Sequence, residues 1–169
     1  SLADDVFFVT FGGLSKNYRV AGFRSGWLVV SGNKRLARDY IEGLNILSSM
    51  RMCANVPCQS AIQTALGGYQ SINDLVKDTG RLRIQRDVAV DMLNSIDGIH
   101  CVKPKGAMYC FARVDEKKFN INNDEQMILD LLRAEKILLV HGKAFNLSDG
   151  VYFRLVFLPH SDVLVPALH

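Results

Sequence analysis

A lysine and an arginine stand eight residues apart in a glycine-framed stretch near the start of the chain. Lys16 follows the apolar run of residues 6–11 and two glycines, and Arg24 comes after it. A neutral lysine amine can attack an aldehyde carbon, and desolvation or a nearby cation favours the neutral form. Arginine offers planar paired donors that suit a phosphate dianion. The pair could therefore bind a phosphorylated aldehyde, although a lysine followed by arginines in a loop is also typical of a solvated basic turn.

A second charged residue lies inside an apolar run. Arg154 interrupts residues 151–157, which otherwise read as a strand. An arginine is costly in such a place unless an anion pairs with it. The alternative is an arginine on the exposed face of an edge strand. The glycines near Lys16 form neither G-x-G-x-x-G nor a G-x-x-x-x-G-K phosphate loop, so they give little support to nucleotide binding.

The stretch of residues 13–27 resembles the signature of class I, fold type I, pyridoxal-phosphate-dependent aminotransferases. Ser15 and Lys16 give the S-K pair, and small or apolar residues followed by G-x-R-x-G end at Arg24 and Gly26. The resemblance implies that Lys16 carries pyridoxal phosphate as a Schiff base and that Arg24 binds its phosphate. Ser15 is the candidate for a hydroxyl contact to the phosphate. Many members have a serine or threonine three residues before the lysine, where this chain has Gly13.

The resemblance continues in order along nearly all of the chain, and it is closest to bacterial alanine (glutamate to pyruvate) aminotransferases. It implies that Arg154 forks onto the α-carboxylate of the substrate. Residues 55–65 and 105–109 are weaker matches, as are residues 141–145, which have His141 in place of the proline of a P-G-x-x-F turn. We assign no catalytic role to these weaker matches.

The reaction that the resemblance implies is a ping-pong transfer of an amino group between alanine and 2-oxoglutarate, in which Lys16 moves a proton from the substrate α-carbon to the cofactor. The family's acidic partner of the pyridine nitrogen, its ring-stacking aromatic residue and an asparagine normally precede the first residue of this chain. We therefore expect little activity from the isolated chain. The resemblance also implies a homodimer for the longer protein, because the family's sites are completed by the other subunit. The alternatives are a carbon–sulfur lyase of the same fold and the aminotransferase-like domain of a transcriptional regulator.

The elements that must position these residues follow from hydrophobic periodicity. Strands are expected at 6–11 and 27–30, on either side of the lysine loop, with helices from Asn33 to near Met50 and over 57–67 and 82–96. Further strands are expected at 100–102, 107–114, 137–140 and 151–158, with a helix over 123–135. This predicts an α/β chain. Residues 1–78 would end a large cofactor-binding domain, 79–98 would connect, and 99–169 would form a truncated small domain.

Composition limits the possible partners. The net charge of +3 comes from scattered residues, so nothing indicates nucleic acid or an anionic membrane as a partner, and no run approaches a membrane span. The four cysteines lack metal-site spacing and are interpreted as free thiols of a cytoplasmic protein that binds no metal. Ser1-Leu2-Ala3 leads almost at once into a strand, and residues 163–169 stop within an apolar pattern. Both ends suggest a piece of a longer protein.

Overall fold

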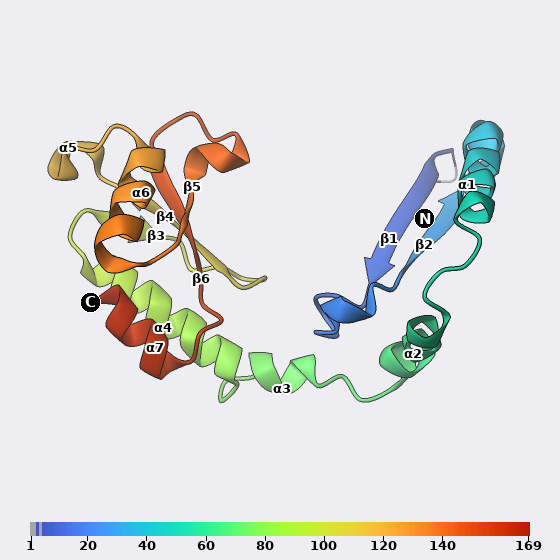
Figure 1. The fold of residues 1–169 in the computed structure, drawn as a ribbon, viewed down its shortest axis with the longest axis horizontal. Helices are drawn as coiled ribbons and strands as arrows, with labels where there is room; N and C mark the ends of the chain where they lie inside the picture. The colour runs from blue at the N-terminus through green and yellow to red at the C-terminus, as the bar shows by residue number, and fades with distance from the viewer. Residues whose placement is uncertain (1–2, 4) are drawn as a thin grey trace. The chain divides into compact units, whose positions relative to one another are not determined.

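The computed structural model describes residue 3 and residues 5–169. They form two compact units, Ser1–Ile72 and Asn73–His169, called here the N-terminal and C-terminal units, and each is described by itself (Figure 1). The expectation drawn from Ser1 and Leu2 lies outside the described residues. No helix within the described part of the chain is long and apolar enough to cross a membrane.

A β-hairpin forms the centre of the N-terminal unit. Strands β1 (Phe7–Gly13) and β2 (Gly26–Gly32) pair antiparallel, with a register that runs from Phe7 opposite Gly32 to Gly13 opposite Gly26. Both strands lie where the apolar runs predict them. An apolar run such as 6–11 is typical of a buried strand, but β1 differs from this, because Phe11 is 74% exposed. The hairpin has only two strands, and neither face is fully covered by another layer.

Helices follow the hairpin. The helix expected from Asn33 begins as the short 3-10 segment η2 (Lys34–Ala37) and continues as α1 (Arg38–Arg51). The side chain of Asn33 accepts a hydrogen bond from the backbone N–H of Arg35, as an N-cap residue does. Helix α2 (Val56–Gly67) has its proline in the first turn, where no backbone donor is lost. Neither α1 nor α2 contains a buried residue.

The C-terminal unit is built on a four-stranded antiparallel sheet in the order β3-β4-β6-β5. The strands are β3 (Ile99–Cys101), β4 (Tyr109–Val114), β5 (Val140–His141) and β6 (Val151–Val156). The strand expected over 137–140 is wrong in extent, because only Val140 and His141 pair with β6. Side chains alternate along β4 and β6, so that one face of the sheet is buried and the other is open.

Helices cover the buried face of this sheet. They are α4 (Arg81–Ser95), α6 (Asp124–Glu135) and α7 (Ser161–Leu168), while α3 (Ile72–Val76) and α5 (Glu116–Phe119) are short (Figure 1). Apolar residues of α4, α6 and α7 pack with those of β3, β4 and β6 into one core. Cys101 and Cys110 belong to this core, and burial raises the pKa of Cys110 to about 12. These two thiols are therefore packing residues, and they stay protonated at neutral pH.

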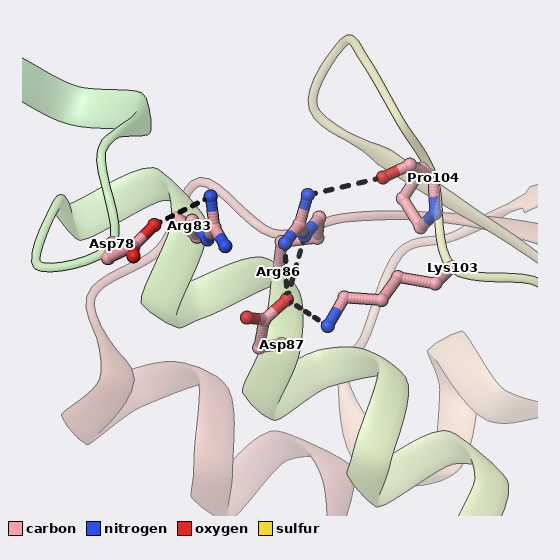
Figure 2. A network of polar contacts seen from close by, with 6 residues as sticks. All are labelled: Asp78, Arg83, Arg86, Asp87, Lys103 and Pro104. Atoms are coloured by element: carbon pink, nitrogen blue, oxygen red, sulfur yellow. Dashed lines mark hydrogen bonds and ion pairs between the residues drawn. The ribbon is translucent and has the colours of Figure 1, made fainter. Parts of the chain in front are cut away.

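A polar network fixes α4 to the segment that follows β3. In Figure 2, the carboxylate of Asp87 accepts from Arg86 at 2.7 Å and from Lys103 at 2.8 Å, and Arg86 also donates to the carbonyl of Pro104 at 3.5 Å. Burial works against the charged form of Asp87, but the hydrogen bonds and charges of Lys103 and Arg86 outweigh it and lower its pKa. The network therefore anchors one end of the loop that leads into β4.

Candidate active site

The lysine loop is closed at its base by the hairpin. The backbone N–H of Leu14 donates to the carbonyl of Ser25 at 3.1 Å, and that of Val20 donates to the carbonyl of Leu14 at 3.3 Å. Leu14 is completely buried, although most of the N-terminal unit is open to solvent. Gly13 and Gly26 face each other at the last pair of the ladder, where the two backbones approach closely. The loop therefore leaves a rigid base and returns to it.

Lys16 and Ser15 lie at the start of this loop. Lys16 is exposed, and its carbonyl accepts from the backbone N–H of Arg19 at 3.1 Å in a tight turn. Ser15 is half-buried. Within the described residues, neither the Lys16 amine nor the Ser15 hydroxyl has a hydrogen-bond or ion-pair partner. Both groups are thus available to a ligand.

Arg24 lies at the other end of the loop, after the 3-10 segment η1 (Ala21–Phe23). Its backbone is left-handed, with φ +50°, and one terminal nitrogen donates to the carbonyl of Ala21 at 3.0 Å. The carbonyl of Phe23 accepts from Asn55 at 3.2 Å and from Ser25 at 3.1 Å. These bonds hold the segment before Arg24, while its guanidinium has no anionic partner among the described residues.

Arg154 belongs to the C-terminal unit and is therefore described apart from the lysine loop. It lies on β6, opposite Phe111 of β4 and Val140 of β5. Because β6 runs between two strands, an edge-strand position for Arg154 is excluded. The side chain is half-buried on the sheet face opposite the core.

Aromatic rings flank the Arg154 guanidinium. Its central carbon lies 4.4 Å from the ring centre of Tyr109 and 4.7 Å from that of Phe145 in the 3-10 segment η3 (Gly142–Phe145). The Nε atom is buried without a hydrogen-bond partner, and no described carboxylate forms an ion pair with this arginine. The two terminal nitrogens are not buried in this way, so a planar pair of donors remains open. This arrangement can bind a carboxylate.

A buried aspartate supports η3. Asp124, the first residue of α6, is fully buried and accepts from the backbone N–H of Lys143 at 2.9 Å, while the Lys143 ammonium lies 3.5 Å from its other oxygen. Burial opposes ionisation of Asp124, but the Lys143 N–H and charge and the N–H of Glu125 outweigh it and lower its pKa. The carboxylate thus ties η3, and with it Phe145, to α6.

Sequence reasoning found the charged residues but gave Tyr109 and Phe145 no role. Both lie in short stretches that match the family weakly, and they are 36 positions apart in the chain. Only the pairing of β4, β5 and β6 brings the two rings to one arginine. A signal was present in the alternation of β4, which places Tyr109 on the open face, but the sequence does not show which strand lies beside it.

The loop groups fit a phosphorylated aldehyde. The closed loop holds an amine and a hydroxyl without partners and a guanidinium without an anionic partner. No cluster of three or more metal-ligating side chains occurs among the described residues. Comparison with known proteins decides the family. The sequence profile described as "Aminotransferase class I and II" matches residues 1–165. The chain belongs to this family.

Other members of the aminotransferase family are close in sequence. The chain is 59% identical to the glutamate-pyruvate aminotransferase AlaA of Haemophilus influenzae, over 99% of this chain and 42% of that protein. It is 53% identical to the alanine aminotransferase of Mycobacterium tuberculosis, over 99% of this chain and 39% of that protein. This aminotransferase chain thus spans about two fifths of the length of these relatives.

Solved structures agree with the aminotransferase assignment. The alanine aminotransferase from Pyrococcus furiosus superposes with a TM-score of 0.88 at 31% identity, covering 99% of this chain and 42% of that one. The tyrosine aminotransferase from Leishmania infantum gives a TM-score of 0.85 at 23% identity, which supports the fold alone. The expected α/β fold, part of an aminotransferase, is confirmed.

Proposed function

We propose that the protein to which this chain belongs transfers an amino group between alanine and 2-oxoglutarate with pyridoxal phosphate as cofactor. The observation that carries the proposal is the closed loop with the unpaired amine of Lys16 and with an Arg24 guanidinium that has no anionic partner among the described residues. The chain that holds this loop is 53–59% identical to named alanine and glutamate-pyruvate aminotransferases. The names of these relatives supply the substrate pair. The proposal extends to a cytoplasmic homodimer.

Each loop residue has a role in this proposal. The Lys16 amine would hold the cofactor at its aldehyde carbon. Arg24 would pair with the phosphate through the donors that the Ala21 carbonyl leaves free, and Ser15 would add a hydroxyl contact. When bound, the cofactor supplies the electron sink for transamination. Once released by the substrate amine, Lys16 would be the base that takes the proton from the substrate α-carbon.

Arg154 has the remaining role, the binding of the substrate α-carboxylate. Its open planar pair of terminal nitrogens matches the two oxygens of a carboxylate, and bidentate pairs of this kind fix orientation as well as affinity. Our domain proposal assigns residues 1–78 to the end of the cofactor-binding domain and residues 99–169 to the small domain, with 79–98 between them. In the structure, α4 packs with the C-terminal unit.

Chemical trapping tests the Lys16 assignment. The full-length protein is treated with borohydride in the presence of pyridoxal phosphate, and the modified peptide is mapped by mass spectrometry. Modification at Lys16, with loss of turnover in Lys16→Ala, is expected. Modification of another residue, or turnover retained in Lys16→Ala, would contradict the assignment. Ammonia release without a 2-oxo acid acceptor would indicate a lyase instead.

A further inference from the structure

The open face of the C-terminal sheet carries a continuous row made of Arg154 and the rings of Tyr109, Phe145, Phe111 and Tyr152. Tyr109, Arg154 and Phe145 form one end of it. Phe145 meets Phe111 edge to face at 5.7 Å, and Phe111 stacks on Tyr152 at 5.5 Å with 17° between the ring planes. The row gives the single Arg154 side chain two aromatic neighbours from different elements.

We propose that Tyr109 and Phe145 are positioning residues, which hold the Arg154 guanidinium in the orientation that binds the substrate carboxylate. This inference rests on the proposed function, because it takes Arg154 as the carboxylate site. It adds two residues that do not themselves bind the substrate's charged groups.

The physical argument begins with the contacts of the guanidinium. An arginine over a ring centre within about 6 Å is attracted to the ring's negative face, and the attraction grows when the pair is desolvated. Here both contacts are well inside that limit, at 4.4 and 4.7 Å, and Nε is shielded from water. Rotation of the guanidinium would break one or both contacts.

The two rings are fixed more firmly than a surface arginine could be. Tyr109 lies in β4, next to the strand that carries Arg154, and its ladder partner is Val156. Phe145 is held by its contact with Phe111 and by the hydrogen bond from Lys143 to the buried Asp124. The Arg154 side chain has therefore already lost conformational freedom before a carboxylate binds, so binding costs less side-chain entropy.

The burial of Nε also determines which nitrogens of Arg154 can donate to a ligand. A buried Nε without a partner cannot serve an incoming ligand unless the ring contacts open, whereas the terminal nitrogens are free. The rings of Tyr109 and Phe145, called here the clamp, therefore direct the carboxylate to the outer edge of the guanidinium, which carries the two terminal nitrogens. Lysine has no planar edge to direct, so Arg154→Lys would lose this geometry even though it keeps the charge.

The test uses propionate, a monocarboxylate without an amino group, as the probe for the carboxylate site. Its dissociation constant is measured by titration calorimetry on the full-length protein with its cofactor, together with KM and kcat for alanine. In Tyr109→Leu and Phe145→Leu we expect the dissociation constant and KM to rise together by roughly threefold to tenfold, with kcat changed less than about twofold. Tyr109→Phe, which keeps the ring face, should stay near wild type.

Tyr152→Leu is the matched control, because the Tyr152 ring belongs to the same row but stacks on Phe111, whereas the rings over the Arg154 guanidinium are those of Tyr109 and Phe145. Its propionate affinity should match that of wild type. Unchanged affinity in both leucine variants, with weakened binding in Arg154→Lys, would overturn the clamp and leave the proposed function standing. Unchanged affinity in Arg154→Lys would instead refute the carboxylate role itself. Because Tyr109 and Phe145 lie in different elements, misfolding of one variant leaves the other as the test.

Discussion

Arg24 combines a charged side chain with a left-handed backbone, which costs a residue other than glycine roughly 1–2 kcal/mol. The loop tolerates this cost because hydrogen bonds to the carbonyls of Ala21 and Phe23 hold the surrounding backbone. Non-glycine residues in this conformation occur at turns and helix ends, and they also cluster at functional sites. The same hydrogen bonds fix the point at which the Arg24 side chain leaves the backbone.

We predict that Arg24→Lys weakens cofactor retention by roughly tenfold or more, because a lysine cannot form the paired donors of a guanidinium. Lys16 stays in place, so the cofactor should still attach when it is supplied in excess. Loss of cofactor absorbance during dialysis of the full-length protein measures retention. Arg35→Lys, at an exposed arginine of η2, is the control and should retain cofactor as wild type does.

Asp124 gives the C-terminal unit a pH-dependent stability. Its pKa is lowered in the fold, so its contribution is present above the unfolded carboxyl pKa of about 4 and is lost as pH falls through the lower folded value. Asp124→Asn should therefore lower the free energy of unfolding by about 1–3 kcal/mol at neutral pH and by less in acid. Denaturant titration across pH checks this. Asp130→Asn, an exposed change on the same helix, should have little effect.

At the scale of elements, Gln85 joins α4 to the segment between β6 and α7. It is 1% exposed, and its amide nitrogen donates to the carbonyl of Phe157 at 2.8 Å and to that of Pro159. Gln85→Leu would leave both carbonyls without this donor, so we predict a loss of about 1–3 kcal/mol in the free energy of unfolding. Denaturant melts measure it, with Asp91→Asn on the exposed side of α4 as the control. A loss no larger than the control's would show that water replaces the amide.

The elements that the sequence predicted well are those with a local start signal. Asn33 and Asn123 cap their helices through side-chain hydrogen bonds, and both helices begin beside them. Helix α7 was not predicted, because its residues 163–168 read only as an apolar run with Pro166 inside it. The strand expected over 137–140 differs in extent from the strand in the structure for a related reason. Its pairing depends on β6, which is far along the chain, and apolar character alone does not show where pairing stops.

The residues of the candidate site also fall into those that the local sequence predicts and those that it does not. The charged residues that contact ligands in our proposal, Lys16, Arg24 and Arg154, were found from residue type and from resemblance to a family motif. The aromatic rings around Arg154 were not found, because strand order and register, rather than local sequence, bring them there. Local sequence motifs therefore cannot identify the residues that only the pairing of distant strands brings to this site.

At the scale of the whole molecule, the two units differ in how much they bury. The described part of the N-terminal unit buries only Leu14 and Ser25, whereas the C-terminal unit has a continuous core. Large apolar side chains such as Phe11, Leu47 and Met50 are more than half exposed. Exposed apolar surface of this extent is typical of regions that contact other protein. The chain spans about two fifths of the length of the relatives it matches.

We predict that the isolated 169-residue chain binds an apolar fluorescent dye more strongly than the full-length protein does and retains pyridoxal phosphate poorly. In denaturant, the N-terminal unit of the isolated chain should lose its structure before the C-terminal unit, because it has less buried apolar surface. Hydrogen exchange resolved by peptide measures the two units separately. Equal protection in both, or cofactor affinity equal to that of the full-length protein, would contradict this prediction.

The packing of Trp27 has an optical consequence. This residue is the chain's single tryptophan, and its indole lies so close to Gly12 that a Cβ added there would come within 2.3 Å of the ring. Light that excites tryptophan selectively therefore gives emission from the hairpin alone, with no background from Asn73–His169. A chromophore attached at Lys16, on the loop that this hairpin carries, would quench that emission. The chain thus contains its own fluorescent reporter for events at the lysine loop.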